Sequence, residues 1–239
     1  MTTPAPDPAL LQKLVYANRI LYDHGIVDGL GHVSVRHDTV PGVFLLSCNR
    51  APALVTAADI VCYDLEGDAV SVTSERPYLE RFIHSEIYRV RPDVVAVVHS
   101  HSPSVIPFGV TGNRLRPVFH MAGFLGSGSS HFEIRDVAGD SDMLIRNGEL
   151  GRALARSLGD CSCVLMRGHG STVVGGSVEQ VVYRALYTEI NAKLQAQALA
   201  MGEVSYLTPG EADLAAAAND GQIARSWDLW CRRIGPLPQ

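Results

Sequence analysis

Two histidines separated by one residue follow an apolar, β-branched segment. His99 and His101 come directly after residues 94–98, which read VVAVV. Side chains alternate along an extended chain, so residues i and i+2 project from the same face. Two imidazoles placed in this way can bind one cation at roughly 2.0–2.2 Å per nitrogen. The alternative is a pair of histidines that merely end a strand, and this motif alone does not choose between the two.

A third histidine lies between two glycines at the end of another apolar segment. The sequence there is Arg167-Gly168-His169-Gly170. Glycine lets the backbone approach its neighbours closely and adopt unusual dihedral angles, as the loops of functional sites often require. A third imidazole would complete a site with open positions for a substrate, which is typical of a catalytic metal. Three imidazoles suit Zn²⁺, Mn²⁺, Fe²⁺ and Co²⁺ alike, so the sequence predicts a divalent metal ion without choosing among them.

The elements that must position these histidines follow from hydrophobic periodicity. We predict helices over residues 8–26, with Asp7 as N-cap, and over 78–90, 143–158 and 177–201. We predict strands over residues 32–36, 43–47, 60–64, 69–72, 94–98, 118–119 and 163–166. One helix, then several strands, then alternating helices and strands indicate a mixed sheet with helices on its faces.

The composition is that of an ordinary soluble globular protein. The length of 239 residues fits one domain over residues 1–239, and 46% of the residues are hydrophobic. The net charge is −5 and no run of Lys or Arg occurs, so a nucleic-acid or anionic-membrane partner has no support. We find no secretory signal and no apolar run long enough to span a membrane. The five cysteines are expected to be free thiols in a reducing compartment, which favours a cytoplasmic enzyme.

A catalytic role for Glu80 is predicted only by a resemblance to a known family. By helical geometry alone, a surface glutamate paired with Arg81 or His84 is the simpler interpretation. The stretch from Glu80 to His101, ERFIHSEIYRVRPDVVAVVHSH, however resembles the signature of the class II aldolase/adducin family. Its sugar-phosphate aldolases and epimerases share the Glu, the R-P-D, the apolar strand and the H-x-H at this spacing.

Two further motifs occur in the family's order, and the similarity covers residues ~10 to ~205. Residues 31–36 (GHVSVR) resemble the family's early G-N-x-S-x-R element, and residues 167–170 resemble its third-ligand loop. The segment 183–199 reads like the family's C-terminal helix. The resemblance implies a three-layer α/β/α fold with a central mixed, mostly antiparallel sheet. It also implies a divalent metal on His99, His101 and His169, Glu80 as acid/base, and a homotetramer with active sites between neighbouring subunits.

This sequence departs from the family where the aldolases bind a phosphorylated sugar. Those members use an Asn after the glycine, a Thr-Gly or Ser-Gly loop, and a Ser-Ser pair before the glutamate, which together cradle a phosphate. Here His32 replaces the Asn, residues 47–50 (SCNR) replace the second loop, and Tyr78-Leu79 replaces the Ser-Ser pair. The bulk of Tyr78 and Leu79 would fill the phosphate space. We infer that the substrate is not a sugar phosphate.

The substrate is instead expected to be flat and anionic. Tyr78 offers an aromatic wall, and Arg50 a planar fork that matches a carboxylate. His32 adds a hydrogen-bond donor or an acid/base group near neutral pH. We therefore predict His32 as a catalytic residue beside Glu80, and predict a set of substrate-binding residues: Arg50, Ser47, Asn49, Tyr78 and His120.

One branch of the family resembles this chain more closely, namely its metal-dependent decarboxylases of hydroxylated aromatic acids. The shared features are residues 46–52 (LSCNRAP), residues 78–84 (YLERFIH) and His120-Met121. In the aldolases a proton-donating Tyr follows the matching His, so Met121 puts aldol cleavage in doubt. The resemblance implies a non-oxidative decarboxylase of an ortho-hydroxylated aromatic dicarboxylate, best 3,4-dihydroxyphthalate, in aromatic catabolism. Glu80 or His32 would deliver the proton to the ring.

Two rival functions remain open from the sequence. One is an aldolase or epimerase that acts on an unphosphorylated hydroxy-acid or sugar. The other is a non-catalytic, adducin-like interaction domain, although such a module has no need of three ligand histidines. Of the other histidines, His24, His37 and His84 are expected on solvated or partly packed faces, and His131 in a mobile loop over residues 126–131.

Overall fold

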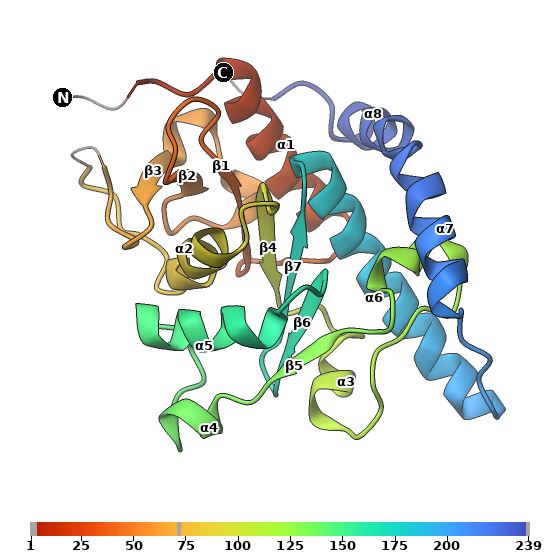
Figure 1. Cartoon of the computed structure of the whole chain (residues 1–239). Coiled ribbons are helices and arrows are strands. Elements are labelled where there is room, and N and C mark those ends of the chain that lie inside the picture. The colour runs from red at the N-terminus through yellow and green to blue at the C-terminus, as the bar shows by residue number, and fades with distance from the viewer. Residues whose placement is uncertain (1–3, 71–72, 238–239) are drawn as a thin grey trace.

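A seven-stranded sheet forms the centre of the molecule, as the computed structural model of residues 4–70 and 73–237 shows (Figure 1). Its strands are β1 (His32–Arg36), β2 (Val43–Ser47), β3 (Ile60–Asp64), β4 (Ala96–Ser100), β5 (Ser130–Phe132), β6 (Cys163–Met166) and β7 (Gly170–Gly175). The strand order is β3-β2-β1-β4-β7-β6-β5. Only the β5–β6 pair is parallel, so the sheet is mixed and mostly antiparallel, as predicted.

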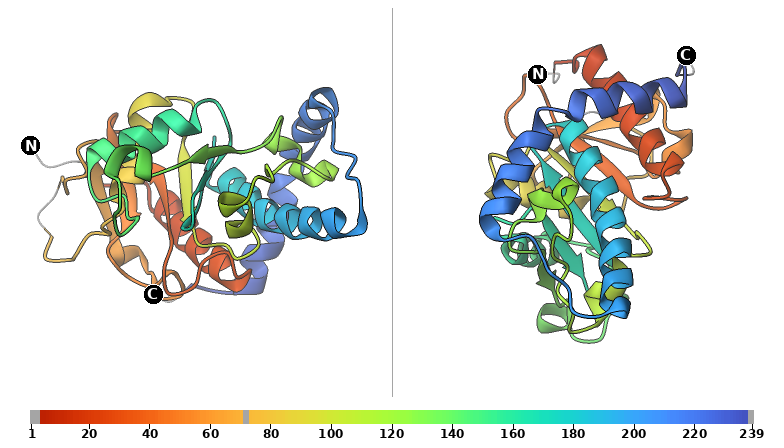
Figure 2. Two further views of the ribbon diagram at one scale, coloured as in Figure 1. Left: turned by 90° about the horizontal axis from the view of Figure 1, so that it is seen from below. Right: turned by 90° about the vertical axis from the view of Figure 1, so that its right-hand side faces the viewer.

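Helices cover both faces of this sheet and complete the α/β/α fold that was predicted. The helices are α1 (Pro8–Asp23), α2 (Arg81–Val90), α3 (Ile106–Val110), α4 (Arg135–Ala138), α5 (Gly148–Leu158), α6 (Val178–Met201), α7 (Pro209–Asp220) and α8 (Ile223–Ile234). Short 3₁₀ segments are η1 (Pro52–Leu54), η2 (Ala57–Asp59) and η3 (His120–Leu125). Figure 2 shows α5 on one side of the sheet and α6 with the C-terminal helices on the other.

Alternate residues of a strand pack into two separate hydrophobic cores. Val98 on β4 packs into a core shared with α1, α6 and α8, whereas its neighbour Val97 packs into a core shared with α2 and α5. This alternation follows from the period of two along a strand. The position of a residue along a strand therefore decides on which face of the sheet its side chain lies.

Asp7 is confirmed as the N-cap of the first predicted helix, and the last predicted helix also has a capped N-terminus. Asp7 accepts a hydrogen bond from the backbone of Ala9 at the start of α1, and Ser177 caps α6 through the backbone of Gln180. Both contacts satisfy donors that a helix terminus leaves free.

The predicted helix over 143–158 is too long at its start. The helix begins at Gly148, where Asn147 is the cap, rather than near Asp142. The residues before it are recruited elsewhere, because the carbonyl of Met143 and the N–H of Ile145 bind side chains of the site described below.

The predicted strand at 118–119 is wrong. Two buried amides on α6 bind this segment instead, since Asn191 accepts from the N–H of Val118 and Gln195 accepts from that of Arg116. Side chains thus satisfy backbone groups that a strand partner would otherwise bind. Of the predicted strand over 69–72, Ala69 forms one isolated bridge with Tyr63, and residues 71–72 lie outside the described residues.

The elements that were not predicted are the strands β5 and β7, the helices α3, α4, α7 and α8, and the short 3₁₀ segments. The strand β7 lies between β4 and β6, so it joins the two segments that carry the histidines. In the part of the chain that the structure describes, no helix is both long enough and apolar enough to cross a membrane.

Candidate metal centre and active site

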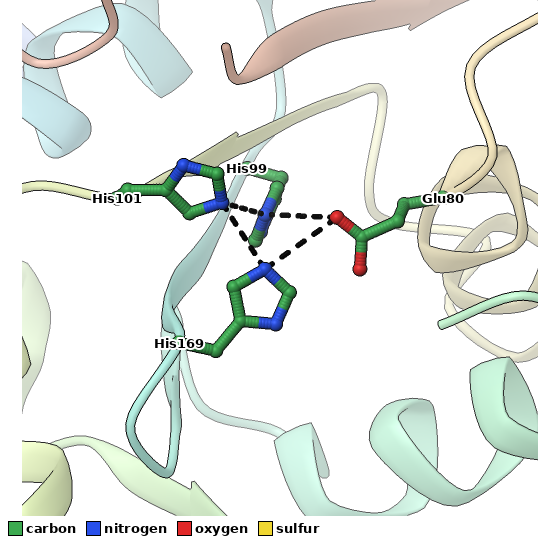
Figure 3. A group of neighbouring side chains, drawn as sticks. All are labelled: Glu80, His99, His101 and His169. Carbon is green, nitrogen blue, oxygen red and sulfur yellow. Dashed lines mark hydrogen bonds and ion pairs between the residues drawn. The ribbon is translucent and has the colours of Figure 1, made fainter. Parts of the chain in front are cut away.

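Four side chains from three segments converge on one point (Figure 3). His99 lies in β4 and His101 just after it, while His169 lies in the turn between β6 and β7. Glu80 precedes the first residue of α2 and occupies its N-cap position. One ligand atom from each residue falls within 4.8 Å of all the others. The structure thus brings together the three histidines and the glutamate that the sequence singled out.

The separations within this cluster match those of a metal-ligand shell. The Nε2 atom of His101 lies 3.3 Å from that of His99 and 3.1 Å from that of His169. The Oε2 atom of Glu80 lies 3.6 Å from Nε2 of His99 and 3.5 Å from Nε2 of His169. Tetrahedral bonds of roughly 2.1 Å place ligand atoms about 3.4 Å apart. The three imidazoles therefore fit around a divalent ion, with the carboxylate of Glu80 close beside them.

Backbone groups orient two of the four side chains of the cluster. The Nδ1–H of His169 donates to the carbonyl of Met143 over 3.0 Å, which leaves the lone pair of Nε2 pointing into the cluster. The N–H of Ile145 donates to Oε1 of Glu80 over 2.9 Å, which turns Oε2 toward the histidines. Met143 has φ +68°, the one positive φ at a non-glycine position among the described residues. Such a conformation concentrates at functional sites, and here it aims a carbonyl at a ligand.

The cluster holds its glutamate ionised. Burial by itself would raise the pKa of Glu80, but its contacts with His169 and His99 bring that pKa well below its ordinary value. Burial lowers the pKa of both His99 and His101, so these rings are neutral and can ligate. Burial also acts to lower the pKa of His169, yet its contact with Glu80 raises it on balance. At neutral pH the site therefore presents a carboxylate on Glu80 and imidazole lone pairs on His99 and His101.

Glycine is required on both sides of His169. Gly168 has φ +63°, a left-handed conformation that other residues rarely adopt. A Cβ atom at Gly170 would lie 2.1 Å from the carbonyl oxygen of Ser100. The glycines thus allow the β6–β7 turn to close against the end of β4, as the sequence indicated.

Strand register fixes a row of side chains across three neighbouring strands. His32 on β1 is paired with His99 on β4, and His99 is paired with Thr172 on β7. Thr172 Oγ1 lies 3.5 Å from Nδ1 of His99. The row lies on the sheet face that α2 and α5 cover, because Val97, two residues before His99, packs into that core.

A cavity of about 320 Å³ opens beside Glu80 and His101. Leucine side chains form much of its wall, contributed by Leu30, Leu79 and Leu144. The polar groups that line it are His32, Asn49, Tyr78, Glu80 and His101. The cavity thus has the size and apolar character to receive a small aromatic ring next to the ligand cluster.

The remaining predicted substrate-binding residues do not line this cavity. The guanidinium of Arg50 pairs with Asp59 at 3.2 Å. Ser47 is fully buried behind Tyr78, with its Oγ 3.5 Å from the tyrosine oxygen. His120 lies at the start of η3, where its backbone carbonyl accepts from the side chain of Asn219. The substrate contacts of Arg50, Ser47 and His120 stay predictions.

Two histidines that were predicted on solvated or partly packed faces are buried instead. His84 is fully buried, and burial lowers its pKa to about 3. Its Nε2 lies 2.6 Å from Nδ1 of His32, so it supports the cavity rather than facing solvent. His37 is also buried, and its Nε2 lies 3.1 Å from the carbonyl of Pro4. Residue type alone gave no sign of these partners, because each is distant in sequence.

The prediction that His131 lies in a mobile loop is also wrong. His131 belongs to strand β5, and its Nε2–H donates to the carbonyl of Gly109 over 2.9 Å. His24 packs edge-on against Trp230, in keeping with the partly packed face expected for it.

Comparison with known proteins found a matching family model, related sequences and solved structures with the same fold. A family model described as Class II Aldolase and Adducin N-terminal domain matches residues 12–196. Decarboxylase tropJ from Talaromyces stipitatus is 38% identical, over 98% of this chain and 96% of its own. The 3,4-dihydroxyphthalate decarboxylase of Arthrobacter keyseri is 31% identical, also over 98% of this chain and 96% of its own. An aldolase II superfamily protein from Pseudomonas syringae has the same fold, with a TM-score of 0.79, 21% identity and coverage of 97% of this chain and 94% of its own.

Proposed function

Since the chain belongs to the class II aldolase and adducin family, we propose that it is a metal-dependent, non-oxidative decarboxylase of ortho-hydroxylated aromatic dicarboxylates. The best substrate is 3,4-dihydroxyphthalate, and the reaction serves the catabolism of aromatic compounds in the cytoplasm. Relatives named as decarboxylases match along almost the whole chain. The observation that carries the proposal is the cavity, in which Tyr78 and Leu79 stand immediately beside Glu80 and the ligand histidines.

The cavity favours an aromatic acid over a sugar phosphate. Tyr78 and His32 stand with ring centroids 4.7 Å apart, and Leu79 and Leu144 add apolar surface. The hydroxyl of Tyr78 donates to the carbonyl of Arg50, which fixes the ring in place. None of the described residues that line the cavity carries a guanidinium or ammonium group for a phosphate. Flat apolar walls next to a cation site suit a chelating hydroxy-acid.

His99, His101 and His169 would hold a divalent ion, whose positive charge would stabilise negative charge on the ring hydroxyl and the adjacent carboxylate of the substrate. Glu80 is ionised, so its Oε2 can accept the proton of that hydroxyl. It then delivers this proton to the ring carbon that bears the carboxylate, and the ring becomes a keto form. The carbon–carbon bond breaks, CO₂ leaves, and its electron pair restores the aromatic ring. One proton from solvent returns to the oxygen, so atoms and charge balance.

His32 lies on the other wall of the cavity and completes the proposed machinery. Its ring is 5.1 Å from that of His99, centroid to centroid, on the neighbouring strand. From there it can contact a substrate held by the histidine cluster. Glu80, whose carboxylate faces the cluster, is the better placed of the two to move the proton.

The test is release of CO₂ by metal-loaded protein from 3,4-dihydroxyphthalate and from hydroxypyridine dicarboxylates. We expect CO₂ and a ring product with one carboxylate fewer, and no product from a Glu80→Gln variant that still binds metal. No CO₂ from any of these acids would overturn the proposal. Turnover of unphosphorylated hydroxy-acids by retro-aldol cleavage would instead identify an aldolase, and a purified protein free of metal would favour an interaction module.

The proposal also includes a homotetramer with active sites between neighbouring subunits. Large apolar side chains are exposed on the C-terminal part of the chain, at Met201, Leu214 and Leu229. Such residues are suited to contact with a second copy.

A further inference from the structure

A line of four buried side chains leads from the cavity into the protein beneath α2. Nδ1 of His32 lies 2.6 Å from Nε2 of His84, and Nδ1 of His84 lies 2.6 Å from Oγ of Ser34. Oγ of Ser34 lies 2.8 Å from the hydroxyl of Tyr88, which in turn reaches the carbonyl of Val95 at 3.3 Å. All four side chains are at most 4% exposed. The reaction proposed above uses His32 but none of the three side chains behind it.

The direction of these hydrogen bonds is set at the inner end. A carbonyl oxygen can only accept, so the hydroxyl of Tyr88 donates to Val95. The backbone N–H of Arg36 donates to the same carbonyl over 2.8 Å, so both of its lone pairs have a donor. The reverse direction would leave two oxygens facing each other at Val95 without a proton between them. A buried polar contact of that kind is costly.

The hydrogen bond from Tyr88 to Val95 sets the donor and the acceptor of each further hydrogen bond in the line. Tyr88 has given its one proton to Val95, so it accepts from Ser34, and Ser34 therefore accepts from Nδ1–H of His84. A neutral imidazole carries one N–H, so Nε2 of His84 bears a lone pair. That lone pair accepts from Nδ1–H of His32.

At the cavity end of this hydrogen-bonded line lies a ring nitrogen of His32 that carries no proton. Because Nδ1 of His32 carries the proton, Nε2 on the opposite edge of the ring carries a lone pair. His32 lines the cavity, and no hydrogen bond among the described residues uses its Nε2. The ring is held between Tyr78 and His99, at centroid distances of 4.7 Å and 5.1 Å.

We infer that His32 is a fixed hydrogen-bond acceptor in the cavity, with His84, Ser34 and Tyr88 as the positioning residues that lock its tautomer. The substrate must then offer a donor to this nitrogen. Resting on the proposed function, the inference names that donor as a second ring hydroxyl, next to the one beside the departing carboxylate. The cavity thus selects dihydroxy over monohydroxy aromatic acids.

The selectivity has a physical origin in desolvation. A substrate without the second hydroxyl would leave Nε2 of His32 without a partner in a site closed to water. Loss of one partner of a buried hydrogen bond lowers binding by about 10–100-fold. We expect this factor in kcat/KM when the hydroxyl is replaced by a group of similar size that cannot donate.

The first experiment reads the tautomer directly. Protein with ¹⁵N-labelled histidine rings and loaded with Zn²⁺, which is diamagnetic, is studied by NMR, with His32 assigned by a His32→Asn variant. We expect a proton on Nδ1 and none on Nε2 of His32. A proton on Nε2 would overturn the inference, whatever the enzyme decarboxylates.

The second experiment compares 3,4-dihydroxyphthalate with 4-fluoro-3-hydroxyphthalate. The fluorine is close to a hydroxyl in size but cannot donate, so kcat/KM is expected to fall about 10–100-fold. Equal turnover of the two acids would refute the acceptor role of His32 while leaving the decarboxylase intact. Absence of CO₂ from both would refute the proposed function and leave the tautomer result standing.

Variants then separate positioning from simple structural support. Tyr88→Phe removes the link to Val95, so the preference for the dihydroxy acid over its fluoro analogue should shrink toward one. Tyr63→Phe is the matched control, since Tyr63 is equally buried but its hydroxyl takes no part in the chain. His84→Leu should lose the preference and His84→Gln should restore part of it, because the glutamine oxygen can still accept from His32. An unchanged preference in Tyr88→Phe and His84→Leu would contradict the positioning role.

Discussion

At the scale of single residues, the site depends on where lone pairs and protons are held. Each of the four side chains of the cluster has one atom facing the centre, and Glu80 and His169 each have a second atom bound by the backbone of the segment 143–145. Supporting contacts of this kind fix the orientation and tautomer of a metal ligand. The chemistry of the site is therefore open to tests by single substitutions.

Removal of a ligand should empty the site. His169→Ala takes away one of the three imidazoles, so metal content after dialysis and CO₂ release should both fall by more than the roughly 10–100-fold that loss of a supporting contact costs. Elemental analysis measures the metal. His131→Ala is the matched control, because the side chain of His131 binds the carbonyl of Gly109 and lies outside the cluster, so that neither quantity should change.

Glu80→Gln should separate binding from turnover. The three histidines remain, so metal stays bound, whereas kcat should fall by about 10²–10⁴ because the amide cannot carry the proton. Steady-state kinetics together with elemental analysis of the same sample check this. Loss of the metal along with activity would make Glu80 a required ligand rather than the proton carrier.

The buried His84 should make stability depend on pH. Its pKa of about 3 in the folded chain lies below the ordinary value of 6.5, so the unfolded chain binds one more proton between these values. The stability that neutral His84 contributes is present above pH 6.5 and is lost as the pH falls toward 3. The loss is about 1.4 kcal/mol per pH unit. Urea unfolding at several pH values should show a slope smaller by this amount in His84→Gln, and equal slopes would contradict the assignment.

At the scale of elements, the sequence predicted what depends on residue type and missed what depends on backbone. Histidine spacing indicated the metal ligands, and apolar periodicity indicated β1 to β4 and α6. The carbonyl of Met143 and the N–H of Ile145 have no residue-type signal, so the start of α5 was misplaced. The strand β7 was missed because glycines at both of its ends, Gly170 and Gly175, read as loop.

The close approach of β7 to β4 provides a test at this scale. Gly170→Ala would place a Cβ atom against the carbonyl oxygen of Ser100, so the strands must separate and the loops that carry His101 and His169 must shift. We expect a loss of about 3 kcal/mol in the free energy of unfolding, together with weaker metal binding. Gly210→Ala, where nothing lies within 4 Å of the new atom, should leave both unchanged.

At the scale of the whole molecule, the family assignment leads to a prediction about assembly. The proposed tetramer should have about four times the mass of one 25.8 kDa chain. Light scattering coupled to size-exclusion chromatography measures this mass. A single-chain mass at the concentration used for activity would contradict both the tetramer and the proposal that neighbouring subunits complete the site.

The pairing of His32 with His99 and of His99 with Thr172 has an evolutionary consequence. A shift of one residue along any one of these strands would turn its side chain in this row to the opposite face, so the part of the site that lies on the strands cannot change register without loss of the fold. Asn49, Leu79 and Leu144, by contrast, line the cavity from outside the strands and are free to vary. A lineage built on this scaffold can therefore accept new substrates through changes in its loops, while His32, His99 and Thr172 keep their places on the strands.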